Sequence, residues 1–550
     1  MAAERSEVKE QFKASGHDWF DLVGPEALEF KQLLGDEPGV RFDPAVGPSQ
    51  PRLSVHLTHA PILGLLDSFC PPRESRRPSH LPQWWWEELR DSQREAAGFI
   101  QGRRGSLLAD ALGGGKTRTA IAGSAHLPLV ILCKKSDAVV WEDELDYAEL
   151  AAQTLLGLAA EPRVIDRTKQ AYIIPYSVAA RWLPWFNGPG GTLILDEGHE
   201  IQNKHTSAAK AAASYPGLQV VILTATPIRN RLASLWSLLN VLAVGKPWGA
   251  LWEFRKAYCG ASMGDYGLVD GEPTQDAVDR LQARLSAVMV KRTRKDLAIA
   301  YPRNTRHSYP LELTWEERKG LTAEASAYLH QRKETKQDKA SQLSLLSWYR
   351  QRVGLIKASA CLALVRELLL NNGRVIVWCW HRETVDLVAK AVKEFAARVD
   401  VITGGTTRAK RHEIAREWRD GPLVPEGGAA LVASIPAANT AISLTACRAQ
   451  VFLELDWAPM QIVQAEARIV RFGQRHENGC ETYYVYAPGT LDEQITTTLL
   501  EKVNETERVL GDDGQGDQIS AITGASPRVS FNCDDDTFMA DALSRIGAES

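Results

Sequence analysis

Nine short apolar runs, gathered in two clusters, constrain the fold of this chain more than any other feature. The runs are LPLVILC, AYIIP, GTLILDE and LQVVILTAT in the first cluster, and RVIVWCW, DVITG, ALVAS, QVFLELD and ETYYVYA in the second. They are rich in β-branched residues and apolar throughout, which is typical of strands covered by helices on both faces. Helical patterns separate them, so the sequence predicts an α/β fold with two parallel-sheet lobes.

The length of 550 residues, with 44% hydrophobic and 24% charged residues, predicts several packed units and excludes wholesale disorder. Strand patterns in DWFDLV and RLSVHL, with helical patterns in PEALEFKQLL and APILGLLDSF, predict a small unit near the N-terminus. The expected segments are a small α/β accessory domain (1–80), a first lobe (81–245), helical insertions with an inter-lobe linker (246–357), a second lobe (358–505) and an acidic, flexible tail (506–550).

Charge is distributed unevenly along the chain. The net charge of −4 excludes a protein coated in positive charge, but it leaves room for a local basic groove. Residues 280–357 hold 17 Lys and Arg against 7 Asp and Glu, a net of +10, whereas residues 505–550 hold 3 against 10, a net of −7. A basic stretch of this kind binds nucleic acid in some proteins and is a solvated face in others. Both interpretations stay open for the middle segment.

The scattered cysteines and the hydropathy pattern predict the cellular setting. The eight cysteines show no CxxC spacing, so we expect reduced thiols rather than a metal framework. The N-terminus lacks the apolar core of a signal peptide, and no apolar run is long enough to span a bilayer. We expect an intracellular protein without membrane association, cytoplasmic and nucleoid-associated in a bacterial or virus-infected cell, or nuclear in a eukaryote.

A glycine-rich loop in LLADALGGGKT lies between an apolar strand and a helical pattern. Its three glycines let backbone N–H groups converge on phosphate oxygens. Lys116 would reach the β- and γ-phosphates of ATP, and Thr117 would bind Mg²⁺. A turn that merely connects a strand to a helix is the alternative. The residues predicted to cradle the phosphates are Gly113, Gly114, Gly115, Lys116 and Thr117.

An acidic pair ends the later apolar run GTLILDE. Asp196 and Glu197 follow a strand whose carboxyl end is expected at the same sheet edge as the glycine-rich loop. Phosphoryl transfer to water requires an acid for Mg²⁺ and a residue that orients or deprotonates the water. We assign Asp196 to the metal and Glu197 to the water. An exposed acidic helix cap is the alternative for the pair taken alone.

Five ordered segments strongly resemble the boxes of the SWI/SNF family of helicase-like ATPases, and the resemblance covers about residues 89–486. They are LADALGGGKT, DEGHEIQN, LTATPIRNRLASLWSLLNVL, KRTRKDL and QAEARIVRFGQ. The resemblance implies two RecA-like lobes and a DNA-stimulated ATPase that moves along double-stranded DNA. Within the family, SIPAANTAISLTAC is most similar to the annealing-helicase branch. The N-terminal unit is similar to the HARP domain in its order of elements, but Arg52-Leu53 stands where that domain has an aromatic residue; a generic α/β cap is the alternative.

The resemblance also implies roles for individual side chains. Gln93 looks like the adenine-reading glutamine, while Arg468 and Arg471, expected on one helical face, look like arginine fingers that reach the γ-phosphate from the second lobe. Gln464 looks like the glutamine facing the same site. Arginine stabilises the charge on a transferring phosphoryl group. Closing of the lobes on ATP and reopening after hydrolysis would then move the protein along DNA.

Further side chains fall in segments that line the family's DNA groove. Hydroxyls and loop amides there would contact phosphates without reading sequence. For Trp141, a place in the core is an equal alternative, and for the arginines a solvated face is. The predicted DNA contacts are Ser136, Trp141, Tyr176, Thr224, Thr226, Arg292, Arg294, Thr403, Ser434 and Thr445.

The expected partner is duplex or branched DNA, contacted by a monomer, with a single-strand-binding protein or other replication and repair factors as further partners. The expected outcome is strand annealing or branch remodelling. Four alternatives stay open: a chromatin-type or transcription-associated remodeller, a motor subunit of a restriction or phage-defence system, a strand-separating helicase, and a nucleotide-gated DNA-binding scaffold with little hydrolysis.

Overall fold

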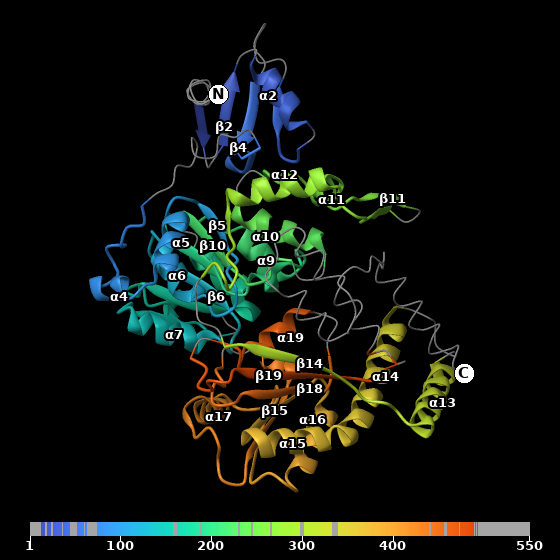
Figure 1. Ribbon diagram of the computed structural model, residues 1–550. Coiled ribbons are helices and arrows are strands. Elements are labelled where there is room, and N and C mark those ends of the chain that lie inside the picture. Colours follow the sequence, from blue (N-terminus) through green and yellow to red (C-terminus); the bar gives the residue numbers. More distant parts are fainter. Residues whose placement is uncertain are drawn as a thin grey trace. The chain divides into compact units, whose positions relative to one another are not determined.

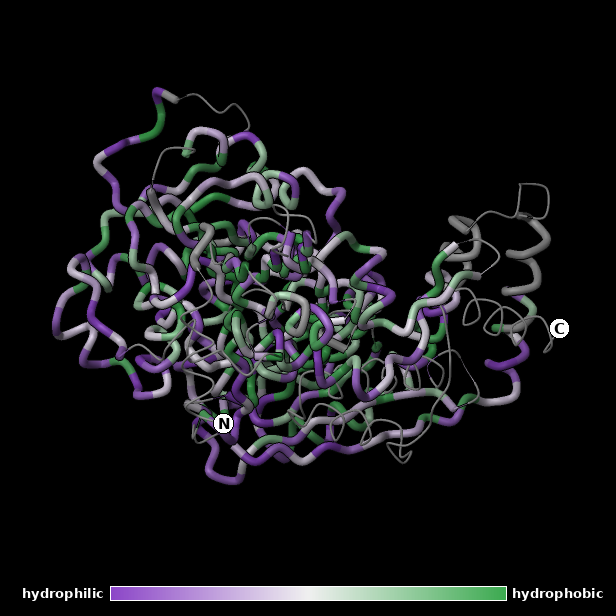
Figure 2. The backbone as a smooth tube through the Cα atoms, turned by 90° about the horizontal axis from the view of Figure 1, so that it is seen from above, coloured by the Kyte–Doolittle hydropathy of each residue, from purple (hydrophilic) through white to green (hydrophobic). Residues whose placement is uncertain are grey.

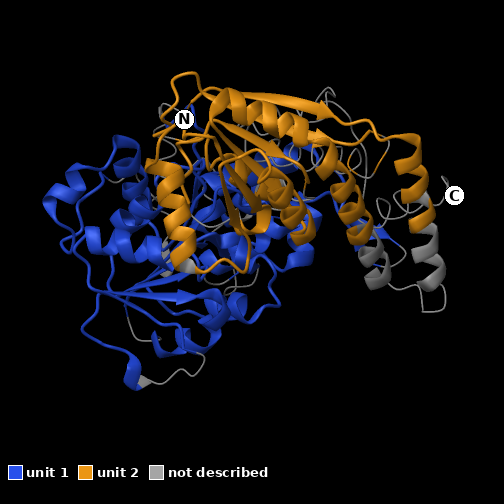
Figure 3. Ribbon diagram, turned by 90° about the horizontal axis from the view of Figure 1, so that it is seen from below, with its two compact units in different colours: residues 1–298, 508–511 blue, residues 299–507, 512–550 orange. Residues whose placement is uncertain are grey.

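The computed structural model forms two compact units, the first running to residue 298 and the second starting at residue 299 (Figures 1 and 3). It describes residues 13–492 except 17–18, 24–25, 36, 44–51, 60, 63–73, 158–161, 187–189, 229–230, 244–245, 265–266, 298–301, 333–338, 439–441, 456–458, 472, 489 and 491. The expected acidic tail lies outside the described residues, as does most of the helix expected at 60–69.

The first unit is built on a seven-stranded parallel sheet in the order β13-β5-β10-β9-β6-β8-β7. Its strands are β5 (Gly105–Leu108), β6 (Leu129–Cys133), β7 (Ala152–Thr154), β8 (Ala171–Pro175), β9 (Thr192–Leu195), β10 (Gln219–Leu223) and β13 (Met289–Val290). Successive residues of β6 enter different clusters, with Val130 in one core and Ile131 in the other. Both faces of the sheet are therefore buried.

Two of the helices of this unit precede β5, others connect the strands, and three lie between β10 and β13. They are α4 (Gln83–Glu87), α5 (Asp91–Gln101), α6 (Lys116–Gly123), α7 (Ala138–Tyr147), α8 (Ala179–Trp182), α9 (Ser207–Ala213), α10 (Leu235–Leu242), α11 (Leu251–Tyr258) and α12 (Gln275–Ser286). A hairpin of β11 (Ser262–Gly264) and β12 (Gly267–Val269) separates α11 from α12 (Figure 1).

The second unit is built on a six-stranded parallel sheet in the order β14-β19-β18-β15-β17-β16. Its strands are β14 (Asn304–Pro310), β15 (Arg374–Cys379), β16 (Arg398–Ile402), β17 (Ala429–Ser434), β18 (Ala449–Phe452) and β19 (Cys480–Tyr486). Its helices are α13 (Trp315–Arg332), α14 (Lys339–Ala360), α15 (Leu362–Asn372), α16 (Arg382–Val392), α17 (Arg408–Asp420), α18 (Ile435–Ala438) and α19 (Pro459–Glu466). Val377 and Trp378 of β15 pack into two different apolar clusters, so both faces of this sheet are buried as well.

All nine apolar runs form strands of these two parallel sheets, which confirms the predicted fold class. Figure 2 follows the hydropathy along the chain, with apolar stretches in green. The basic middle segment is mainly helical, as expected, but it also contributes β14, a strand that the sequence did not predict. β14 has the polar sequence NTRHSYP, lies at the sheet edge and contains no fully buried residue, so it lacks the apolar signature of the central strands.

The N-terminal unit is a four-stranded antiparallel sheet in the order β1-β2-β4-β3 with one helix. The elements are β1 (Lys13–Gly16), β2 (Trp19–Val23), α2 (Glu26–Leu34), β3 (Arg41–Asp43) and β4 (Arg52–His56). The predicted strands DWFDLV and RLSVHL and the predicted helix PEALEFKQLL are confirmed. Leu53 and Val55 belong to the same apolar cluster as Leu281 of α12, so this domain and the first lobe share one core.

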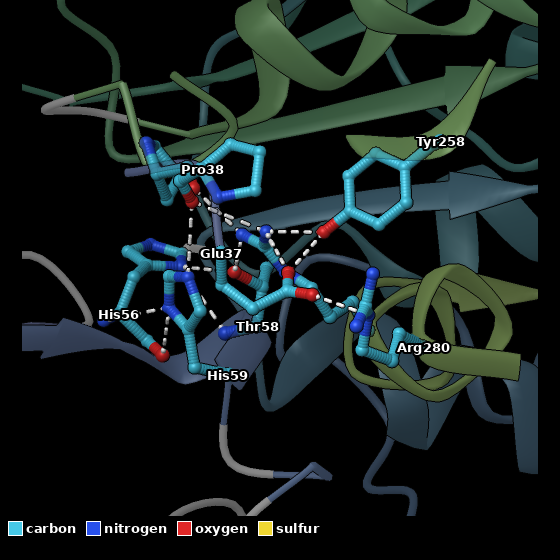
Figure 4. Close-up of polar contacts among 9 residues, drawn as sticks. Glu37, Pro38, His56, Thr58, His59, Tyr258 and Arg280 are labelled. Atoms are coloured by element: carbon cyan, nitrogen blue, oxygen red, sulfur yellow. Dashed lines mark hydrogen bonds and ion pairs between the residues drawn. The ribbon is translucent and has the colours of Figure 1, made fainter. Parts of the chain in front are cut away.

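A buried ion pair fastens the N-terminal domain to the insertion helices (Figure 4). The Glu37 carboxylate accepts hydrogen bonds from Tyr258 of α11 and from Arg284 of α12, the latter at 3.1 Å. The Arg284 guanidinium also donates to Thr58 and lies over the Trp248 ring, and its side chain is 0% exposed. Because a buried charge is stable only when paired and hydrogen-bonded, this network holds the two parts in one arrangement.

Candidate nucleotide-binding site

The glycine-rich loop lies between β5 and α6, and its backbone requires glycine at Gly113 and Gly115. Both have left-handed φ angles, 82° and 77°. A Cβ atom on Gly115 would lie 2.5 Å from the Gln93 side chain. The Gln93 amide instead donates to the Gly115 carbonyl at 3.2 Å, and the Arg90 guanidinium donates to the Gly114 carbonyl. The side chains of Gln93 in α5 and of Arg90, the residue before it, therefore hold the loop by donating to the loop's carbonyl groups.

Lys116 is the first residue of α6, and its ammonium group folds back over the loop. It donates to the carbonyls of Asp110 at 2.9 Å and Ala111 at 3.3 Å. Burial lowers the pKa of Lys116, while the nearby carboxylates of Glu197, Asp110 and Asp196 act to raise it. The lysine of the loop and the acidic pair are thus within electrostatic reach of each other, as the sequence analysis expected.

Asp196 follows β9 and is held by three hydrogen bonds. The indole N–H of Trp141 donates to one carboxylate oxygen at 2.8 Å, and the backbone N–H of Glu197 donates to the other at 3.0 Å. The Tyr176 hydroxyl donates to the backbone carbonyl of Asp196 at 2.7 Å. Burial and the neighbouring Glu197 charge raise the pKa of Asp196. The site therefore holds a carboxylate that a nearby cation would stabilise.

Glu197 adopts a left-handed φ of 50° and lies beside His199. Burial acts to raise the pKa of Glu197, but hydrogen bonding to His199 and the charges of His199, Lys116 and Lys134 outweigh it, and the pKa is lowered. His199 lies 3.2 Å from Glu197 and 3.3 Å from Glu200, and the Lys134 ammonium lies 3.2 Å from Glu200. These contacts keep the Glu197 carboxylate ionised and fix the orientation of its side chain.

The oxygen donors at this edge fit Mg²⁺. Thr117 supplies a hydroxyl and Asp196 a carboxylate, and Mg²⁺ is usually bound through one or two carboxylates together with substrate phosphates and water. The raised pKa of Asp196 indicates that its negative charge is not fully balanced by the surrounding side chains. Among the described residues, no cluster of three or more His, Cys, Asp or Glu side chains could hold a metal by itself.

For Trp141, the structure supports the core alternative over the DNA contact. Its side chain is 0% exposed and directed at Asp196, so DNA cannot touch it. Tyr176 is partly buried and likewise supports the acidic pair. Thr224 and Thr226 follow β10 and are buried, with the Thr226 N–H donating to the Thr224 hydroxyl at 3.1 Å. Ser136 is exposed at the start of the segment leading into α7.

Arg292 and Arg294 follow β13 and are only partly exposed. The Arg292 guanidinium binds both carboxylate oxygens of Asp110, at 3.0 and 2.5 Å, and donates to the Ser92 carbonyl. Asp110 opens the glycine-rich loop and is fully buried. The solvated-face interpretation is therefore wrong for Arg292, because its charge is used inside the first lobe.

In the second unit, Gln464 lies on α19 and is buried. The sequence analysis expected Arg468 and Arg471 on the same helix, but α19 ends at Glu466 and both arginines follow it in turns. Arg471 donates to the Ile442 carbonyl at 3.2 Å, and the Leu444 N–H donates to the Arg468 carbonyl at 3.0 Å. Local backbone hydrogen bonds continue past α19, from the Ala467 N–H to the Val463 carbonyl at 3.0 Å and from the Val470 N–H to the Glu466 carbonyl at 3.2 Å. The two arginines therefore lie in an irregular continuation of α19 and not within the helix, as was expected.

The other residues predicted in the second unit lie at strand ends or in loops. Thr403 follows β16, and its N–H donates to Thr406 at 2.9 Å. Ser434 ends β17 and Thr445 lies in the segment before β18; both are buried.

Besides the support of Asp196 by Trp141 and Tyr176, sequence reasoning missed three further supports of the site. They are Arg90 under the loop, His199 beside Glu197, and the Arg292–Asp110 pair. The adjacency of histidine to the acids in DEGHE was a usable signal for His199. The pairing of Arg292 with Asp110 joins residues 182 positions apart and left no local signal.

Comparison with protein families gives two consecutive matches. Residues 83–353 match the SNF2-related domain, and residues 358–473 match the helicase conserved C-terminal domain. The matched regions contain the glycine-rich loop and the acidic pair in the first and Arg468 and Arg471 in the second.

Curated relatives agree with these matches at modest identity. A Xenopus tropicalis protein named SWI/SNF-related matrix-associated actin-dependent regulator of chromatin subfamily A-like protein 1 is 25% identical over 437 residues, which cover 77% of this chain and 44% of that protein. The DNA annealing helicase and endonuclease ZRANB3 of Bos taurus is 25% identical over 486 residues, which cover 84% of this chain and 44% of that protein. The chain thus spans less than half the length of either relative.

Among solved structures, the Sulfolobus solfataricus SWI2/SNF2 ATPase core in complex with dsDNA aligns with 82% of this chain and 97% of its own, at 20% identity and a TM-score of 0.38. Among the described residues, no helix has the length and apolarity needed to cross a membrane. The two consecutive domain matches, which contain the loop, the acidic pair, Arg468 and Arg471, place this chain in the SNF2-related family, with a helicase conserved C-terminal domain following the SNF2-related domain.

Proposed function

We propose that this chain hydrolyses ATP when DNA is bound and uses the energy to move along double-stranded DNA. The observation that carries the proposal is the electrostatic proximity of Lys116 to Asp196 and Glu197 at the carboxyl ends of β5 and β9. A phosphate-binding lysine beside two acids is the arrangement that phosphoryl transfer to water requires. Family membership supports the DNA dependence.

The chain's own residues supply the steps of hydrolysis. The loop amides and Lys116 would bind the phosphates, and Gln93, which contacts the loop, is the proposed adenine-binding residue. Bound Mg²⁺ would neutralise phosphate charge, with Thr117 and Asp196 as its protein ligands. Glu197, kept ionised by His199, accepts a hydrogen bond from the attacking water and takes up its proton. We further propose that Arg468 and Arg471 act on the γ-phosphate.

DNA is the proposed partner, and strand annealing or branch remodelling is the proposed outcome. The annealing-helicase name of one relative supports the outcome, as does the IPAA stretch of Ile435–Ala438. Of the predicted DNA contacts, Ser136 is exposed and Thr403 and Arg294 are half-exposed; Arg292 and Tyr176 are also half-exposed but contact Asp110 and Asp196. A motor subunit of a restriction or phage-defence system and a strand-separating helicase remain the alternatives, as does a scaffold with little hydrolysis.

A coupled ATPase assay over a panel of single-stranded, duplex and forked DNAs at fixed salt tests the proposal. We expect duplex or forked DNA to stimulate turnover, and Lys116→Ala or Glu197→Gln to abolish it. Full DNA-stimulated turnover by either variant would contradict the mechanism. Stimulation by single strands alone would favour strand separation, and absence of turnover in the unaltered protein would favour a scaffold. A strand-annealing assay on bubble DNA coated with single-strand-binding protein then separates annealing from unwinding.

A further inference from the structure

Lys134 lies close to the proposed water-activating carboxylate, although it takes no part in the proposed hydrolysis steps. It directly follows β6, which pairs in parallel with β9 so that Leu132 lies opposite Leu195. The pairing continues past β9, because the Asp196 N–H donates to the Leu132 carbonyl at 2.8 Å. Parallel neighbours end at the same edge of a sheet, so Lys134 leaves the sheet next to the acidic pair.

The Lys134 ammonium contacts one side of the His199 ring, and Glu197 contacts the other side. Lys134 Nζ lies 3.2 Å from Glu200 Oε1 and 3.4 Å from His199 Nε2. The same Glu200 oxygen lies 3.3 Å from His199 Nε2, whereas His199 Nδ1 lies 3.2 Å from Glu197 Oε2. Because an ionised carboxylate only accepts hydrogen bonds, a proton on Nδ1 is directed at Glu197. The ring is therefore held at Nε2 while Nδ1 presents its donor to Glu197.

The backbone of the turn that carries His199 is fixed. The Glu200 N–H donates to the Glu197 carbonyl at 3.0 Å, and Glu197 has a left-handed φ of 50°. A Cβ atom on Gly198 would lie 2.3 Å from the Ile222 side chain, so the turn packs directly against β10. The orientation of the buried His199 ring therefore depends on the side chains that contact it.

Of these contacts, the Glu200 carboxylate is the one that most needs support from Lys134. Hydrogen bonding to His199 and the Lys134 charge outweigh burial and lower the pKa of Glu200 to about 2, so Glu200 is ionised at neutral pH. Its side chain is 33% exposed, and water competes for an ionised carboxylate at such a position. The Lys134 ammonium keeps the carboxylate against the His199 ring.

Resting on the proposed function, we infer that Lys134 is a positioning residue for ATP hydrolysis. Lys134 holds Glu200 against His199, and His199 holds the Glu197 carboxylate in the direction from which it accepts the proton of the attacking water. Two alternatives make different predictions. Lys134 could instead bind a DNA phosphate beside the exposed Ser136, or form a surface ion pair without effect on turnover.

Removing the Lys134 charge tests the inference. In Lys134→Met we expect kcat at saturating duplex DNA to fall about tenfold, less than the roughly hundredfold cost of a 1 Å misplacement, because Lys134 acts through two other side chains. KM for ATP and the DNA concentration that gives half-maximal stimulation should stay within about twofold, since an interaction that matters in the transition state changes kcat rather than binding. Lys135→Met makes the same charge change at an exposed neighbour and should leave kcat unchanged.

A double-mutant cycle shows whether Lys134 acts through Glu200. Glu200→Gln should also lower kcat about tenfold. If the two residues act as one unit, Lys134→Met/Glu200→Gln should lose about tenfold as well, whereas independent effects should multiply to about a hundredfold. Thermal unfolding of each variant shows whether the fold is retained. If Lys134→Met alone does not fold, the double variant, which keeps the net charge, should fold and show the same tenfold loss.

The outcomes separate failure of this inference from failure of the proposed function. If the unaltered protein shows no DNA-stimulated turnover, the proposed function fails and the role of Lys134 with it. If turnover is present and is lost in Glu197→Gln, equal kcat in Lys134→Met and Lys135→Met would overturn the role. A loss that saturating DNA or ATP removes would also overturn it, because Lys134 would then act in binding. Multiplying losses in the cycle would do the same, and failure of both Lys134 variants to fold would assign the residue to stability alone.

Discussion

The indole N–H of Trp141 donates to the Asp196 carboxylate at 2.8 Å from a fully buried position on α7. The donor stabilises the ionised form of a carboxylate whose pKa is raised by burial. A core residue far from β9 in sequence thus sets the direction of the proposed Mg²⁺ ligand.

Replacing this donor should weaken the use of Mg²⁺. Trp141→Phe keeps an aromatic ring but leaves one Asp196 oxygen without its partner, and loss of such a supporting hydrogen bond typically costs 10–100-fold in metal affinity, so about that range is expected. The measurement is a Mg²⁺ titration of DNA-stimulated turnover. Trp182→Phe is the control, because that buried indole donates to the Gly157 carbonyl instead, at 3.0 Å. Equal Mg²⁺ dependence in the two variants would contradict the assigned role.

A methyl group at Gly115 should impair ATP binding. Gly115→Ala places Cβ 2.5 Å from the Gln93 amide at a left-handed backbone position, so the loop or Gln93 must shift. We expect KM for ATP to rise by about tenfold or more, since left-handed strain alone costs about 1–2 kcal/mol. Gly320→Ala on α13, where no atom lies within 4 Å, is the control and should leave KM unchanged. An unchanged KM in Gly115→Ala would show that the loop tolerates the displacement.

The buried pair between Glu37 and Arg284 should carry most of the polar attachment of the N-terminal domain. Arg284→Met leaves Glu37 buried without its main cation, and breaking a buried pair in this way costs about 3–5 kcal/mol. Arg280 contacts the same carboxylate at 2.9 Å but is 40% exposed, so Arg280→Gln should cost about 0–1 kcal/mol. Urea unfolding measures both, and hydrogen exchange in β4 and α12 locates the change. Similar losses of unfolding free energy in Arg284→Met and Arg280→Gln would show that burial does not determine how much each ion pair contributes to stability.

The same interface should weaken in acid. Burial, aided by the Arg284 charge, lowers the pKa of His56 from 6.5 to about 3 and that of His59 well below 6.5. Both histidines therefore bind protons in the unfolded chain at a pH where they remain neutral in the fold. Stability is fully present above pH 6.5 and falls as the pH drops toward about 3, by up to about 1.4 kcal/mol per pH unit for each histidine.

Unfolding in urea at several pH values between 5 and 8 checks this prediction. His59→Gln keeps a polar side chain near the Pro38 carbonyl, which the His59 ring contacts at 3.1 Å, and should flatten the pH dependence. His307 of β14, partly exposed and stacked on Tyr483, provides the control variant His307→Gln. A pH dependence that His59→Gln leaves intact would assign the acid sensitivity to other groups.

The parts of the fold predicted from the sequence are those where burial acts on a whole segment. Strands such as β6 and β15 are covered on both faces, so every residue of β6 and all of β15 after Arg374 are apolar, and each strand can be recognised from its own sequence. β14 escaped prediction because an edge strand has one open side and tolerates the polar sequence NTRHSYP. Two-residue β13 is too short to show any period.

The candidate site divides in the same way. Lys116, Asp196 and Glu197 were predictable because the loop and the strand–acid junction are local patterns. Trp141 supports Asp196, and Arg292 supports the loop through Asp110. Each pair joins residues far apart in the sequence, so no local pattern predicts the contact. The end of α19 at Glu466 likewise has no signal in the helical spacing of Arg468 and Arg471.

The buried Arg284 side chain of α12 also affects where the chain can be truncated. The SNF2-related match begins at residue 83, which suggests a convenient starting point for expressing the motor without its first 82 residues. Such a truncation would remove Glu37 and Thr58, so the Arg284 guanidinium would keep its contact with Trp248 but lose these two partners. It would also expose the leucines of α12 that pack against the N-terminal domain. We therefore expect substitutions on this face of α12 to be accompanied by substitutions in the N-terminal domain. The N-terminal domain and α12 are expected to be inherited together rather than exchanged separately.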